Sequence, residues 1–243
     1  MPGISTIFLK SVHPRGGSTV PQYAAIAGRF SYSAEDILAV WNDREYLSTL
    51  IDDYWFLTDE ILRKNNAARG YLYPETYIIT DEDVTIQEIT QVILAMTDEK
   101  LSQRKEAIED SGRTVHQFLT LTSVVENESL FQEDRPVIAG VFINRLEQGM
   151  PLQSDITVLY ALQEKRVDVT YEDLEVDSRY NTYKYSGLPI GPVCSPSAPA
   201  MDDVLDYEKS DYLFFFAKED GTVIFSKTLE EHEKPTKENA LLI

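Results

Sequence analysis

The segment from residue 114 to residue 149 constrains this chain most, because its local signals specify two consecutive helices. Thr114, followed three positions later by Gln117, has the pattern of a capping box at a helix start. Pro136 fits the first turn of a second helix, with Asp134 as its expected N-cap, and Gly149 fits the stop. Both helices need other elements against which to bury their apolar faces.

The first of these helices carries two glutamates, Glu126 and Glu128, within the sequence SVVENES. At about 100° per residue, Glu128 falls inside the apolar stripe of the helix and Glu126 falls on its flank. The stripe contains Phe118, Leu121, Val124 and Val125, and the polar side contains His116, Thr120, Ser123 and Asn127. We therefore expect the polar side to face solvent and Glu128 to lie among apolar residues.

A carboxyl in an apolar environment is a candidate acid–base group. Burial disfavours its charged form, and a carboxyl that holds a proton near neutral pH can protonate a leaving group. The alternative for Glu128 is a position at the helix end, from which the side chain reaches water. Glu126 has two open interpretations: a role in a site, or a flank charge that bonds to a neighbouring loop.

A polar cluster precedes a helix that we expect over residues 154–165. Gln153, Ser154 and Asp155 are consecutive there, and Ser154 or Asp155 is the expected N-cap. The two interpretations of Asp155, as a cap and as a site residue, stay open.

A second polar cluster occupies residues 179–197, which have no regular periodicity. This stretch combines Asn181, Thr182 and Tyr183 with glycines and prolines. Stiff loops of this composition present amides, hydroxyls and aromatic faces, which suit sugars. The alternative for its tyrosines is packing, with each hydroxyl bonded to a partner.

The whole pattern predicts a helix-rich α+β protein with a small antiparallel sheet. Strands are expected over 5–12 and at the end of 68–80, with a β-hairpin over 211–227. Further helices are expected over 18–30, 33–43, 84–108 and, as two short segments, 45–66. We predict a small N-terminal lobe over residues 1–68 and a larger domain over 69–243.

Composition excludes several classes of function. The net charge is −19, from 41 acidic and 22 basic residues, which disfavours nucleic acid and anionic membrane surfaces as partners. Cys194 is the only cysteine, so no internal disulfide forms, and three histidines cannot complete a cysteine–histidine metal cluster. No apolar run approaches the roughly 20 residues of a membrane span, and the first residues are too polar for a signal peptide.

Five motifs follow one another along the chain. They are GYLYPETY (70–77), SVVENES (123–129), VFINRLEQGMPLQSDITVLY (141–160), YNTYKYSGLPIGPVCSPS (180–197) and YLFFFAKEDGTVIFSKTLEEH (212–232). In this order they resemble the MltG, or YceG-like, family of endolytic murein transglycosylases, over about residues 68–235. Upstream, HPRGGSTVPQYAAIA and SAEDILAVWND look like the end of a LysM-like segment.

This resemblance implies that the second glutamate, Glu128, is catalytic. It implies cleavage between N-acetylmuramic acid and N-acetylglucosamine without water, which leaves a 1,6-anhydro end. Glu128 would protonate the leaving oxygen and then take the proton of the C6 hydroxyl, so no cofactor and no metal are implied. Substrate contacts are expected from Glu126, Gln153, Ser154, Asp155, Tyr160, Asn181, Thr182 and Tyr183.

The resemblance also implies a bacterial enzyme that is anchored in the membrane and faces the extracytoplasmic side, with the anchor outside this sequence. Its partners would be peptidoglycan glycan strands and the cell-wall synthesis and division machinery. The chain departs from the family pattern at Arg69, where an acidic residue is frequent, and at Ile156 and Ile190, where proline is more usual. Arg69 puts a carboxylate role for the first motif in doubt.

Two other hypotheses stay open. A hydrolytic muramidase would need a second carboxylate, for which Asp155 and Glu126 are the candidates. A non-catalytic cell-wall scaffold would bind glycan strands without turnover.

Overall fold

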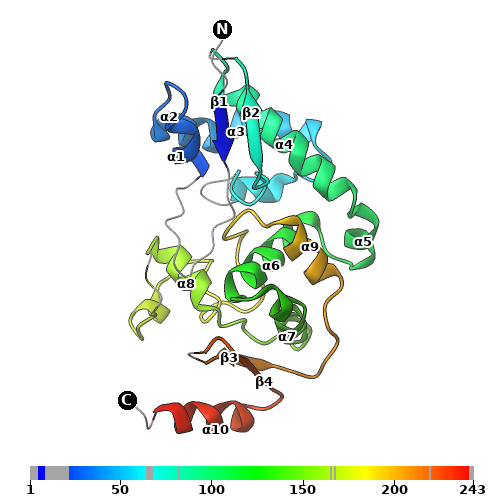
Figure 1. The fold of residues 1–243 in the computed structure, drawn as a ribbon, viewed down its shortest axis with the longest axis vertical. Coiled ribbons are helices and arrows are strands. Elements are labelled where there is room, and N and C mark those ends of the chain that lie inside the picture. Colours follow the sequence, from blue (N-terminus) through cyan, green and yellow to red (C-terminus); the bar gives the residue numbers. More distant parts are fainter. Residues whose placement is uncertain are drawn as a thin grey trace.

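The computed structural model describes residues 5–8, 22–63, 68–81, 83–164, 166, 168–218 and 220–240. Figure 1 shows two halves, one above the other. The upper half contains β1 (Ser5–Phe8), α1 (Gln22–Ala27), α2 (Ala34–Asn42), α3 (Arg44–Asp53), the short 3₁₀ helix η1 (Asp59–Arg63), β2 (Thr76–Ile79) and α4 (Ile86–Ser102). None of the helices within these described ranges is long and apolar enough to cross a membrane.

The lower half is centred on the two helices that the sequence specifies most strongly. After α5 (Lys105–Asp110) it contains α6 (Val115–Glu128), η2 (Gln132–Asp134), α7 (Arg135–Glu147), α8 (Asp155–Leu162), η3 (Asp173–Glu175) and α9 (Ala198–Leu205). The chain then forms β3 (Phe214–Ala217), β4 (Val223–Ser226) and α10 (Leu229–Ala240). The α+β class and the predicted hairpin are therefore confirmed, because β3 and β4 pair antiparallel.

Local capping sets the helix starts that the sequence predicts. Ser33 accepts from the N–H of Asp36 at 3.1 Å in a capping box at α2. Thr114 accepts from the N–H of Gln117 at 3.1 Å in the same arrangement at α6. Asp134 occupies the N-cap position of α7 and Pro136 lies in the first turn, both as predicted, although the Asp134 side chain makes no cap hydrogen bond.

The single helix predicted over 84–108 is wrong, because α4 ends at Ser102 and α5 begins at Lys105. Between them Arg104 has φ −116° and ψ 2°, outside the helical region. Its guanidinium donates to both carboxylate oxygens of Asp202, at 2.7 and 2.8 Å. This forked ion pair links the break to α9, a contact between distant residues that local periodicity cannot reveal.

Packing in the upper half joins residues on both sides of position 68. β1 pairs antiparallel with β2, and Trp41 Nε1 of α2 donates to Thr90 Oγ1 of α4 at 2.9 Å. Both side chains are buried. The division at residue 68 stays a prediction, but in space β2 and α4 lie with the N-terminal elements (Figure 1).

The polar side predicted for α6 does not face solvent, so that expectation is wrong. His116, Thr120, Ser123 and Asn127 are exposed by only 7, 0, 0 and 4%. Thr120 Oγ1 donates to the His116 carbonyl at 2.7 Å, and Asn127 Nδ2 donates to the Ser123 carbonyl at 2.7 Å. Because the Thr120 and Asn127 groups bond to the backbone of their own helix, they can be buried without being left unsatisfied. The 188–197 loop contacts this side of α6, where the Val193 N–H donates to Ser123 Oγ at 3.0 Å.

Gly70 makes a close contact between the two halves. Its φ is +96°, and an added Cβ would lie 2.4 Å from Cβ of Pro192. Nearby, Tyr71 Oη bonds to His116 Nδ1, and His116 Nε2 lies 2.9 Å from the carbonyl oxygen of Ile190. The first motif is thus fixed against both α6 and the loop of the fourth motif.

Replacing Gly70 by alanine should therefore lower stability more than replacing Gly187, which has a similar φ of +90° and nothing within 4 Å of an added Cβ. Both variants carry the left-handed backbone strain of about 1 kcal/mol. Only Gly70→Ala adds overpacking against proline, for which we expect about 1–3 kcal/mol more. Urea unfolding checks this difference, and equal losses would contradict the close contact.

Cys194 gives a second prediction, because it is only 1% exposed. Burial, followed by the negative charge of Glu126, raises the pKa of its thiol well above the ordinary value. The folded chain should resist iodoacetamide at pH 8, whereas the urea-unfolded chain should react readily. Intact-mass measurement distinguishes the two, with Cys194→Ser as the unlabelled control. Rapid alkylation of the folded chain would mean that the thiol is accessible.

Candidate functional site

Glu128 is the last residue of α6 and lies where the apolar core meets the surface. Leu121, Val124 and Val125 of the predicted stripe are 0% exposed, whereas Glu128 itself is half-buried. Its Oε1 accepts a hydrogen bond of 2.5 Å from Ser154 Oγ. The carboxyl is therefore held on the core side by a hydroxyl while part of the side chain remains accessible.

Ser154 is fixed by two buried threonines, Thr157 and Thr182. Its N–H donates to Thr182 Oγ1 at 3.0 Å, and its carbonyl accepts from Thr157 Oγ1 at 2.7 Å. Thr157 Oγ1 also lies 2.8 Å from Thr182 Oγ1. Ser154 occupies the N-cap position of α8 as predicted, but its side chain makes no cap bond. The hydroxyl bonds to Glu128 instead.

Arg145, near the end of α7, holds the loop that leads to Ser154. Its Nη1 donates to the carbonyls of Pro151 and Leu152 at 3.1 and 2.8 Å, and to Gln153 Oε1 at 3.2 Å. Its Nε donates to the Leu213 carbonyl at 2.6 Å. Burial lowers the pKa of this guanidinium. The sequence did not single out Arg145, because most of its partners are backbone carbonyls, which no residue pattern marks.

Gln153 and Asp155 flank Ser154 and are both exposed. Gln153 has a φ of 53°, in the left-handed region, and its N–H donates to the Thr182 carbonyl at 3.1 Å. Asp155 Oδ1 accepts from Tyr183 Oη at 2.6 Å. Alternation along this turn therefore buries Ser154 and presents its two neighbours to solvent.

Tyr183 is half-buried and keeps its proton. Burial is the main cause that raises its pKa, followed by the hydrogen bond to Asp155 and the negative charges of Asp155 and Glu128. Asp155 also follows Ser154 directly in the chain, and Ser154 bonds to Glu128. Glu128, Ser154, Asp155 and Tyr183 thus form one cluster.

Asn181 is fully buried and organises the loop from within. Its Nδ2 donates to the carbonyls of Leu174 and Val176 at 2.7 and 2.9 Å, and its Oδ1 accepts from the Tyr183 N–H at 3.0 Å. The predicted residues Asn181 and Thr182 therefore contact protein groups rather than open space. Their geometry fixes the backbone that carries Tyr183.

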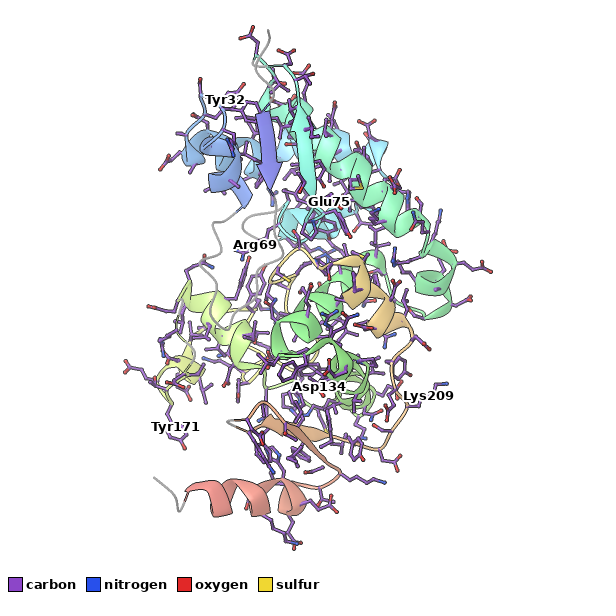
Figure 2. The ribbon with its side chains drawn as sticks, viewed as in Figure 1. Tyr32, Arg69, Glu75, Asp134, Tyr171 and Lys209 are labelled. Carbon is purple, nitrogen blue, oxygen red and sulfur yellow. The ribbon has the colours of Figure 1, made fainter. Side chains whose placement is uncertain are left out.

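Tyr160 lies at the edge of the cluster and joins it to the upper half. Its ring packs at 4.5 Å from that of Tyr180, and the guanidinium of Arg69 lies 4.7 Å from its centre. Figure 2 shows Arg69 between the two halves, above α8. The residue that replaces the expected acid of the first motif thus makes a cation–π contact with a predicted site residue.

Glu126 is separated from this cluster. It is 6% exposed, its Oε2 accepts from the Ser197 N–H at 3.0 Å, and its Oε1 accepts from Ser197 Oγ at 2.6 Å. Ser197 is the N-cap residue of α9. Of the two interpretations of Glu126, the bond to a neighbouring loop is the one observed.

The site contains the partly accessible Glu128 carboxyl, to which the Ser154 hydroxyl donates. Beside it lie the exposed side chains of Gln153 and Asp155 and the phenol of Tyr183. A carboxyl of this kind can donate a proton to a substrate oxygen and later accept one. Among the side chains that the structure describes, no group of three or more histidine, cysteine or acidic residues could hold a metal ion.

Comparison with known proteins finds relatives that match most of this chain. The chain is 38% identical to an endolytic murein transglycosylase of Bacillus subtilis over 214 residues, 87% of this chain and 59% of that protein. It is 37% identical to one of Streptococcus pneumoniae over 239 residues, 92% of this chain and 43% of that protein. The chain thus spans about half the length of these relatives.

A solved structure shows the same fold. The crystal structure of a putative YceG-like protein of Listeria monocytogenes superposes with a TM-score of 0.87 at 38% identity, covering 95% of this chain and 75% of that one. The YceG-like family itself matches residues 15–238. This chain therefore belongs to the YceG-like family.

Proposed function

We propose that this chain is the catalytic part of an endolytic peptidoglycan transglycosylase that cleaves the glycan strand without water. The observation that carries the proposal is the half-buried Glu128 carboxyl with the Ser154 hydroxyl at 2.5 Å. Relatives at 37–38% identity are named endolytic murein transglycosylases, which supports murein as the substrate class.

In the proposed reaction, Glu128 gives its proton to the glycosidic oxygen between N-acetylmuramic acid and N-acetylglucosamine as that bond breaks. The resulting carboxylate then takes the proton of the C6 hydroxyl on the muramic sugar, whose oxygen closes the 1,6-anhydro ring. Glu128 ends protonated, as it began, so the proton balance closes without water. The Ser154 O–H stabilises the carboxylate between the two steps because it donates to a charged acceptor.

The eight residues predicted to contact substrate divide by accessibility. We propose that exposed Gln153 and Asp155, with half-buried Tyr160 and Tyr183, contact the sugars. The other four are buried, and we propose that they position these contacts: Glu126, Ser154, Asn181 and Thr182. In this proposal the Gln153 amide and the Tyr183 phenol form hydrogen bonds with sugar hydroxyls, and the rings of Tyr160 and Tyr183 pack against sugar C–H faces.

The hydrolytic alternative fits the site less well. Glu126 is buried and bonded to Ser197, so it has no access to a water beside the sugar. Asp155 is accessible, but its Oδ1 already accepts a hydrogen bond of 2.6 Å from Tyr183 Oη, so that oxygen is engaged within the protein.

The wider setting rests on family resemblance. We propose that the N-terminal residues 1–68 form a partial LysM-like lobe and that residues 69–243 form the catalytic domain. We also propose that the whole protein is anchored in the membrane, faces the extracytoplasmic side, and works with the cell-wall synthesis and division machinery.

Glu128→Gln should reduce turnover of uncrosslinked glycan strands by about 100-fold or more, because glutamine has the same shape but cannot transfer a proton. Mass spectrometry of the products measures this and identifies their ends. The parent chain should produce anhydromuramic ends. Asp155→Asn is the matched control, and it should retain the anhydro product with weaker binding.

Other outcomes would overturn the proposal. Reducing muramic ends that carry ¹⁸O from labelled water, lost in Asp155→Asn, would indicate a hydrolase with two carboxylates. Strand binding by the parent without any turnover would indicate a scaffold.

Ser154→Ala should lower kcat by about 10-fold or more with little change in KM, because the hydroxyl acts on Glu128 rather than on substrate. Ser154→Thr keeps the hydroxyl and should retain most of the activity. Steady-state kinetics on soluble glycan strands checks both variants. A change confined to KM in Ser154→Ala would place this hydroxyl on the sugar instead.

A further inference from the structure

A cavity of about 560 Å³ lies at the start of α6, away from Glu128. Its walls come from η1, α6, the end of α7 and the loop of the fourth motif. They are formed by Glu60, Arg63, Arg113, His116, Gln117, Thr120, Leu146, Glu147, Gly187, Leu188, Pro189 and Ile190. Its size is within the range of small-ligand sites, and none of the residues of the Glu128 cluster lines it.

Two cations of this cavity, Arg63 and Arg113, make no ion pair with a described carboxylate. Among the described residues, neither Arg63 nor Arg113 lies within 4.0 Å of a carboxylate oxygen. The nearby Glu60 carboxylate instead accepts from the hydroxyls of Thr58 and Thr114, each at 3.3 Å. The wall also contains Glu147, but neither glutamate pairs with an arginine, and within the described part of this chain of net charge −19 two arginines without ion pairs in one concave site indicate an anionic ligand.

Another part of the cavity wall is apolar. Leu146, Leu188, Pro189 and Ile190 supply it, and Ile190 is held by the contact of its carbonyl with His116 Nε2. A ligand that fits both walls combines carboxylates with small apolar side chains. A short acidic peptide has this chemistry, whereas a neutral sugar does not.

The cavity lies within reach of the Glu128 cluster. Gln117 and Glu128 are eleven positions apart on α6, so their directions differ by only about 20°. Thr120 precedes Glu128 by eight residues, which is about 12 Å along the helix axis. Gly187 of the cavity wall also pairs with Pro151, at the start of the loop that carries Ser154.

We propose that this cavity binds the stem peptide of the glycan strand, through carboxylates at Arg63 and Arg113 and alanine methyl groups at the apolar wall. The proposal rests on the proposed function, which places a muramic sugar beside Glu128. A five-residue peptide attached to that sugar spans at most about 17 Å, which exceeds the roughly 12 Å of helix axis between Glu128 and Thr120, the cavity residue of α6 that lies nearest to it in sequence. The cavity would thus select strands that carry peptides over bare strands.

The test compares two substrates with one variant. Arg63→Gln/Arg113→Gln should raise KM about 10-fold for peptide-bearing strands and leave bare strands, stripped by an amidase, unchanged. The control Arg29→Gln/Lys209→Gln removes two exposed positive charges elsewhere (Lys209 is labelled in Figure 2) and should change neither. An equal change on both substrates, or on neither, would overturn the proposal. Arg63 is exposed, so Arg63→Gln alone serves if the double variant does not fold.

A binding measurement separates this proposal from the proposed function. The free peptide L-Ala-γ-D-Glu-L-Lys-D-Ala-D-Ala is titrated into the full chain by calorimetry, beside its form with amidated carboxyls. Binding of the acid form, lost in the double variant and absent for the amide, supports the cavity even if no strand is cleaved. Equal binding of the acid and amidated peptides would overturn the proposed peptide site. So would the absence of binding by both peptides while the chain still cleaves strands.

Discussion

The hydrogen bond between Ser154 and Glu128 is the interaction on which the site depends. It joins the C-terminal end of α6 to the N-terminal end of α8, two elements that are 26 positions apart at this contact. Because Glu128 ends its helix, nothing in α6 alone fixes the direction of the side chain. The hydroxyl that fixes it is itself held at its N–H and at its carbonyl by Thr182 and Thr157.

This support extends to the C-terminal hairpin through Arg145. One guanidinium contacts the carbonyls at 151 and 152 and the carbonyl of Leu213 just before β3, and it lies 5.0 Å from the ring centre of Phe214. On that same ring, His232 of α10 stacks at 5.4 Å. Burial and the Arg145 charge both lower the pKa of His232. The hairpin and α10 are therefore packed against the residue that holds the site loop, which makes them part of its support.

Capping residues and the apolar period of the sequence correctly predicted where several helices begin and which of their residues are buried. Capping residues such as Thr114 marked helix starts, and the apolar period placed Glu128 in line with buried Leu121 and Val124. The same period misplaced the polar side of α6, because hydroxyl and amide side chains that bond to their own helix can be buried at little cost. The bend at Arg104 and the role of Arg145 depend on partners about 100 and 70 positions away. Residue spacing within one helix cannot predict contacts between residues so far apart in the sequence.

The pair of glutamates shows how one helix can assign two carboxyls to different tasks. Residues two positions apart point about 200° away from each other, so Glu126 and Glu128 cannot both face the same cleft. Glu126 points into the protein and holds the start of α9 through Ser197. Glu128 points toward Ser154 and the accessible cluster. A reaction that uses one carboxyl as acid and then as base requires only this single accessible group, so the spacing of the two glutamates is compatible with lytic chemistry and unfavourable for a mechanism that pairs them.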